Sequence, residues 1–92
     1  MFFADRSHLN LITGAQIRAG RAFTRLTAKE LAELAGVGRT TVLRAEDSDG
    51  VPAATTANLN AIKSALEAKG VIFWENGGLT YDPGKPPQAA GK

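Results

Sequence analysis

The side chains best suited to chemistry in this chain lie in a short stretch near its middle. Four of them share one face of a helix that should begin near Gly38 or Arg39, and a core would need none of them: Arg39, Thr40, Leu43 and Arg44. A guanidinium group can donate two parallel hydrogen bonds to a planar pair of acceptors, such as guanine O6 and N7. A threonine hydroxyl can meet a base edge or a phosphate, and a leucine can meet a thymine methyl group. This face therefore has the chemistry needed to contact nucleic acid.

Two short helices joined by a tight turn, over residues 27–46, are expected to position that face. Thr27 and Glu30, three residues apart, form a capping box that gives the first helix a defined start. Gly36 can adopt the positive φ that ends this helix and begins the turn. Ala32 is small enough for the second helix to cross close by. Apolar residues at helical spacing complete the predicted buried face and the corner of the turn: Leu31, Leu34, Ala35, Val37, Val42 and Ala45.

This pattern resembles the helix-turn-helix of the phage repressor and Cro family, also called the XRE family. The small residue, the glycine and the apolar positions of the family are met at Leu31, Ala32, Ala35, Gly36, Val37, Val42 and Ala45. The alternative, an ordinary helical hairpin with a fortuitous glycine, does not account for agreement at all of them. The resemblance implies a four-helix domain whose helix from Arg39 enters the major groove of DNA. It also implies that Arg21 pairs with Glu46, the glutamate that ends that helix.

Candidate phosphate contacts surround this helix pair. Between Arg6 and Arg44 the chain has seven basic and two acidic residues, whereas from Ala45 to Lys92 it has four basic and six acidic residues. A basic front half suits phosphate binding, although a solvated charged surface would have the same composition. The candidates are a basic stripe on the preceding helix, the N–H groups at the start of the next helix, and one further threonine: Arg18, Arg21 and Arg25; Thr27, Ala28 and Lys29; and Thr41.

The remaining sequence predicts a mainly α domain with a short C-terminal strand or hairpin. We expect an N-terminal arm over 1–12, the helix-turn-helix domain over 13–70, a hairpin over 71–82 and a disordered tail over 83–92. Thr13 and Gln16 form a second capping box, opening a helix that should run to about Phe23. Thr55 or Thr56 should cap a fourth helix that stops before Gly70.

The C-terminal hairpin is the predicted dimerisation element. Ninety-two residues bury only a small core, and the absence of cysteine excludes disulfides and thiolate metal sites, so oligomerisation is the natural supplement. Phe73 and Trp74 point to opposite sides of a strand, so one should face the core and the other a second subunit. The residues assigned to this role are Val71, Ile72, Phe73 and Trp74.

Taken together, the sequence favours a sequence-specific regulator of transcription that binds a palindromic operator in double-stranded DNA as a homodimer. The alternative is an antitoxin or other partner-binding module, in which the C-terminal segment grips a small protein partner. An enzyme has little support, because the chain has no cysteine, one histidine in the arm and no phosphate-cradling glycine motif. We expect no cofactor and no metal. Because no apolar run approaches the ~18–20 residues of a membrane span, and no secretory signal opens the chain, a cytoplasmic protein is expected.

Overall fold

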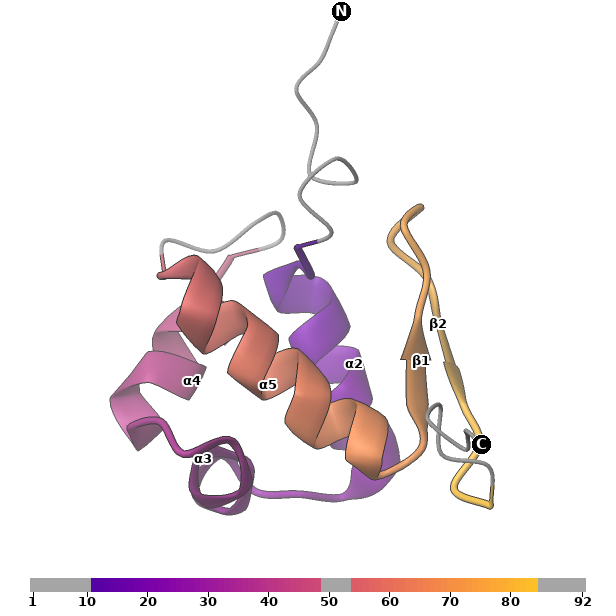
Figure 1. Ribbon diagram of the computed structural model, residues 1–92, viewed down its shortest axis with the longest axis horizontal. Coiled ribbons are helices and arrows are strands. Elements are labelled where there is room, and N and C mark those ends of the chain that lie inside the picture. Colours follow the sequence, from indigo (N-terminus) through magenta and orange to yellow (C-terminus); the bar gives the residue numbers. More distant parts are fainter. Residues whose placement is uncertain (1–10, 49–53, 85–92) are drawn as a thin grey trace, which may run out of the picture.

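The computed structural model describes residues 11–48 and 54–84. Within these ranges four helices are followed by a two-stranded antiparallel sheet (Figure 1): α2 (Gly14–Thr24), α3 (Ala28–Ala35), α4 (Arg39–Glu46), α5 (Thr56–Ala68), β1 (Val71–Phe73) and β2 (Leu79–Tyr81). The predicted fold class, mainly α with a short C-terminal hairpin, is confirmed. Most of the predicted arm and tail, residues 1–10 and 85–92, lies outside the described residues.

The helix ends form at the residues whose chemistry predicted them. The Thr27 hydroxyl accepts a hydrogen bond from the Glu30 amide at 3.0 Å, and the Glu30 carboxylate accepts one from the Thr27 amide at 2.8 Å. Thr13 opens α2 with the same reciprocal arrangement. Gly36 ends α3 with a φ of 72°, and of the two candidate caps of α5 it is Thr55 that serves. Local side-chain chemistry thus sets the boundaries of these helices.

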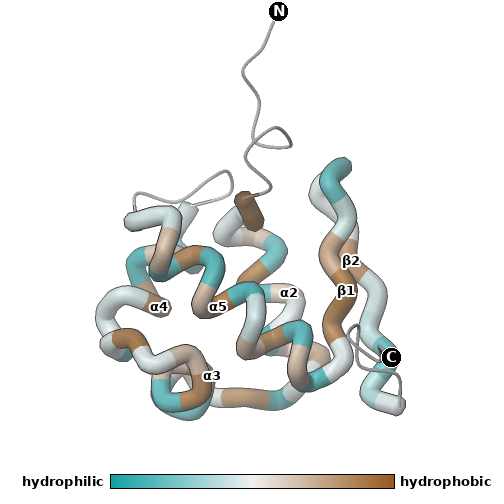
Figure 2. The backbone as a smooth tube through the Cα atoms, viewed as in Figure 1, coloured by the Kyte–Doolittle hydropathy of each residue, from teal (hydrophilic) through white to brown (hydrophobic). Residues whose placement is uncertain are grey.

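The four helices enclose one apolar core. α3 packs against α4 and α5, and α2 contacts α4, α5 and both strands. Brown and teal segments alternate along α5 in Figure 2, as expected for a helix with one buried face. The fully buried apolar side chains come from every helix and from β1: Ile17, Leu31, Val42, Ala45, Leu59, Ile62, Leu66 and Val71.

Two large apolar side chains of the helices are exposed, and one of them, Leu34, was expected to be buried. Leu34, assigned to the apolar face of α3, has an exposed fraction of 51%, because the buried face runs through Leu31 and Ala35 and Leu34 lies beside it. Phe23, expected to anchor the end of α2, has an exposed fraction of 54%. Its ring stacks on that of Tyr81, with 5.6 Å between the ring centroids. Phe23 thus contacts the hairpin from the end of α2.

The hairpin packs one face on the helices: both strands contact α2, and β1 also lies beside the end of α5 (Figure 1). Its register pairs Val71 with Tyr81, Ile72 with Thr80 and Phe73 with Leu79. The predicted turn is present, and Gly77 adopts a φ of 95° in it. The side-chain amide of buried Gln16, on α2, donates hydrogen bonds to the carbonyl oxygens of Trp74 at 3.1 Å and Gly78 at 2.9 Å. One polar side chain therefore holds the turn end of the hairpin against α2.

Candidate nucleic-acid interface

The two faces of α4 separate as the sequence predicted. Val42 and Ala45 have exposed fractions of 0%, and the opposite face is exposed, with 41% for Leu43. That face carries all four candidate base contacts: Arg39, Thr40, Leu43 and Arg44. Among the described residues, neither Arg39 nor Arg44 has a side-chain hydrogen bond or ion pair. α4 thus presents two exposed guanidinium groups whose donors are available to a ligand.

The other helix-turn-helix positions fill the structural roles assigned to them. The Val37 amide donates to the Ala32 carbonyl at 3.0 Å across the turn, which Gly36 makes possible. Side chains of Leu31 and Ala32 are buried in the core, and those of Ala35 and Val37 pack against it half-buried. The turn therefore fixes the angle at which α4 leaves α3.

The start of α3 offers two free amides rather than the expected three. The Thr27 N–H is already bonded to the Glu30 carboxylate at 2.8 Å, so the assignment of Thr27 as an amide donor to phosphate is wrong. The N–H groups of Ala28 and Lys29 occupy the first helical turn, where α-helical geometry gives them no partner within the helix. Ala28 as a whole residue has an exposed fraction of only 8%, so Lys29 is the more accessible of the two. These two amides, with the exposed Lys29, can hold an anion.

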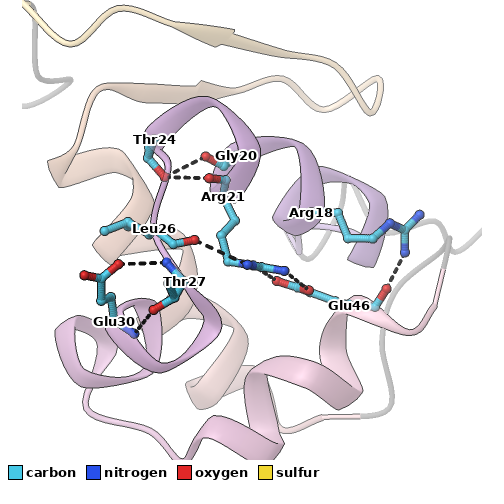
Figure 3. Close-up of polar contacts among 8 residues, drawn as sticks. All are labelled: Arg18, Gly20, Arg21, Thr24, Leu26, Thr27, Glu30 and Glu46. Atoms are coloured by element: carbon cyan, nitrogen blue, oxygen red, sulfur yellow. Dashed lines mark hydrogen bonds and ion pairs between the residues drawn. The ribbon is translucent and has the colours of Figure 1, made fainter.

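Arg21 and Glu46 form the pair that the family resemblance implied (Figure 3). Arg21 Nε lies 2.6 Å from Glu46 Oε2 and Nη2 lies 2.9 Å from Oε1, so the contact is bidentate. The side chain of Glu46 has an exposed fraction of only 8%, against 30% for Arg21. The hydrogen bond with Glu46 raises the pKa of Arg21, against the lowering by desolvation, and the charge of Glu46 adds to the rise. The pair fixes the end of α4 to α2.

Arg18 is also directed at the end of α4, a role that the sequence did not indicate. Its Nη1 donates to the carbonyl oxygen of Glu46 and, at 3.3 Å, to that of Ser48 (Figure 3 shows the first). Helix ends leave carbonyl groups without partners, and a cation there also offsets the negative end of the helix dipole. Two arginines of the predicted phosphate stripe thus hold the last turn of α4.

Arg25, the third arginine of the stripe, differs from the other two. It is exposed and terminates α2 with a φ of 61°, in the left-handed region that glycine favours. It is the one residue other than glycine with a positive φ in the described part of the chain. Unlike Arg18 and Arg21, Arg25 has no side-chain hydrogen bond or ion pair in the described part of the chain, which leaves it as the phosphate candidate on α2.

A close backbone contact brings α2 against the end of α4. A Cβ atom at Gly14 would lie 1.8 Å from the Ser48 carbonyl oxygen and 2.5 Å from that of Ala45. Glycine is therefore required there by space, and no sequence pattern indicated it. Together with Arg18 and Arg21, this contact sets where α4 points.

A small cleft lies between α4 and the start of α5. Its volume is about 160 Å³, and it is lined by residues of α4, of α5 and of the segment just before α5: Thr41, Arg44, Ala54, Thr55 and Asn58. Thr41 is half-buried there, beside the exposed Arg44. The cleft therefore joins a predicted phosphate contact to a predicted base contact, and adds Thr55 and Asn58, which no sequence pattern had assigned to the interface.

The predicted dimerisation residues divide between the two faces of the hairpin. Val71 has an exposed fraction of 0%, so its side chain lies in the core and does not reach a subunit interface. Phe73 is half-buried against the core, as expected for one member of the pair Phe73 and Trp74. Strand alternation places Ile72 and Trp74 on the other face, where Trp74 has an exposed fraction of 52%. Trp74 Nε1 donates to the Thr80 hydroxyl at 3.0 Å. The outer face of the hairpin is therefore available to a second subunit.

Comparison of the chain with models of protein families found no matching family, and comparison with curated proteins found no matching protein. Within the described ranges, no helix is long and apolar enough to cross a membrane. In the same residues, no group of three or more histidine or acidic side chains is placed to hold a metal ion.

Proposed function

We propose that this protein is a sequence-specific regulator of transcription that binds double-stranded DNA as a homodimer in the cytoplasm. One observation carries the proposal: α4 presents Arg39 and Arg44 without partners in the described structure, while its other face and its last turn are fixed to the domain. A helix held this firmly can enter the major groove in one orientation, which base recognition requires.

In this proposal, one set of residues contacts the bases and another set positions α4 on the DNA. Arg39 and Arg44 would each donate a pair of hydrogen bonds to a guanine, and Leu43 would meet a thymine methyl group. The Ala28 and Lys29 amides would hold a phosphate at the start of α3, which sets the register of α4 on the duplex. The charged pair Arg21–Glu46 would keep the reading helix in place without itself touching DNA.

The homodimer would form through the outer face of the hairpin, where Ile72 and Trp74 lie. A two-fold axis there would place two copies of α4 on one side of the duplex. Half-sites about 34 Å apart, one turn of DNA, or a multiple of this distance, would then form a palindrome.

Selection of bound sites from randomised duplex DNA tests this proposal. The expected result is an enriched palindrome whose half-sites are about one helical turn apart, with sedimentation showing a dimer on it. A variant carrying both Arg39→Ala and Arg44→Ala should enrich no sequence, whereas Lys69→Ala, which removes one exposed charge at the end of α5, should enrich the same palindrome. The proposal fails if the unaltered protein enriches nothing, or if it stays monomeric at high micromolar concentration with and without DNA.

A further inference from the structure

An apolar groove on α3 has no part in the proposed DNA contact. Its volume is about 310 Å³, and it is lined by Leu26, Glu30, Glu33 and Leu34. Leu34 is half exposed there, at 51%, and Leu26 is half-buried against the core. The lining thus combines two leucines with two carboxylates and contains no basic side chain.

The charges of the groove exclude some occupants and favour others. A phosphate group inside the groove would meet the carboxylate of Glu33, which has no counter-charge among the described residues, so nucleic acid is not a suitable occupant of the groove itself. Glu30 has one carboxylate oxygen bonded to the Thr27 amide, which fixes the position of its charge. Within the described residues, Glu33 is exposed and has no ion-pair partner. The groove therefore complements a ligand that has both an apolar side chain and positive charges.

We propose that this groove docks a basic amphipathic helix of a partner protein. An aliphatic side chain of that helix would insert between Leu26 and Leu34, and lysine or arginine side chains on the flanking turns would face Glu30 and Glu33. Charge complementarity at such a rim gives specificity and a faster association more than raw affinity. The proposal does not depend on DNA binding, because none of the four lining residues is assigned a contact with DNA.

A nuclear magnetic resonance titration of the isotope-labelled full-length protein tests the site. The probe is a synthetic amphipathic peptide with leucine at helical spacing and lysine on its flanks, and the control has the same leucines with glutamate in place of lysine. The lysine peptide should shift amide signals at Leu26, Glu30, Glu33 and Leu34, and the glutamate peptide should not. Equal shifts with both peptides, shifts centred on the hairpin, or no shift at millimolar peptide would overturn the proposal.

Matched variants locate the contact. Glu33→Lys should lower the affinity for the lysine peptide by about three- to tenfold, the range expected when an exposed ion pair is replaced by a like-charge contact. Leu34→Ser should weaken it at least as much, whereas Leu43→Ser, which removes a similarly exposed leucine from α4, should leave it unchanged. Shifts at the groove that depend on protein concentration without any peptide would instead identify a second copy of this chain as the occupant. Operator binding by the Leu34→Ser variant should be normal, so failure here is distinct from failure of the DNA-binding proposal.

Discussion

Both α2 and α4 carry arginines, but the arginines of the two helices differ in whether their guanidinium groups have partners within the protein. Arg21 is bidentate with Glu46, and Arg18 donates to carbonyl oxygens at the end of α4. On α4, by contrast, Arg39 and Arg44 are exposed and, in the described structure, have no side-chain partner. The first helix uses its positive charge inside the protein, and the second presents it outward.

This difference shows why a count of charges is a poor guide to a binding surface. Residues 6–44 have an excess of basic side chains, yet the charge of Arg21 is balanced by Glu46. Arg18 and Arg21 lie where α4 ends, and positive charge there offsets the negative end of the helix dipole. Two of the three arginines on α2 therefore hold α4 in place, and the arginines with donors available to a ligand lie on α4.

The largest effect is expected from Arg21→Ala, which should lower the free energy of unfolding by about 2–3 kcal/mol. It leaves the carboxylate of Glu46, only 8% exposed, without its counter-charge. Urea unfolding followed by circular dichroism measures the loss. Arg21→Lys keeps the charge but not the bidentate geometry, so it should lose less. A loss below about 0.5 kcal/mol for Arg21→Ala, the size of an ordinary surface change, would show that the pair does not hold α4.

The arginines of α4 should show the opposite behaviour. Arg39→Ala or Arg44→Ala should cost about 1–3 kcal/mol of affinity for the selected operator and relax preference at one base pair. Stability should change by less than about 0.5 kcal/mol, because neither side chain has a partner to lose in the described structure. Titrations against operator and scrambled duplexes measure the ratio of the two affinities. If both variants keep that ratio, α4 does not read DNA and the helix-turn-helix is only a scaffold.

Arg18→Ala tests whether the stripe on α2 contacts DNA at all. The bonds from Arg18 to the end of α4 lead us to expect a stability loss of about 1 kcal/mol. A phosphate contact would add a second effect, a decrease of about one in the salt dependence of binding, equal for all sequences. Unfolding curves and titrations at several salt concentrations separate the two. If the free energy of unfolding is unchanged and the salt dependence of binding decreases, Arg18 contacts a DNA phosphate and does not hold α4.

The sequence predicts those parts of the fold that depend on near neighbours in the chain. The two capping boxes and the positive φ of Gly36 need only residues a few positions apart, and all three are present in the folded chain. The pairing of Arg21 with Glu46 spans the domain, and only the family resemblance supplied it. The helix boundaries and this one contact could therefore be predicted before the structure was known.

The features that the sequence did not predict depend on how the elements cross. Gly14 is required because α2 passes close to the Ser48 carbonyl, and helical periodicity contains no information about that distance. Arg18 reaches the end of α4 for the same reason. The burial of Val71 and the exposure of Leu34 follow from which face each element turns to the core. Val71 and Phe73 of the predicted dimerisation set face the core, because strand alternation alone does not determine which face of the hairpin packs on the helices.

The smallest effect, and the most informative about α2, is expected from Arg25→Gly. Arg25 ends α2 with a φ of 61°, where a side chain costs roughly 1 kcal/mol and glycine costs little, so this variant should be more stable by about 0.5 kcal/mol. If Arg25 binds a phosphate, the same variant should bind every duplex more weakly, and the slope of log affinity against log salt concentration should decrease by about one.

Arg25→Ala is the matched control, because it removes the charge and keeps the strained backbone. It should lose the same affinity without gaining stability. A more stable Arg25→Gly protein that binds DNA normally would show that Arg25 has no role in binding, and would remove it from the proposed DNA-contacting surface.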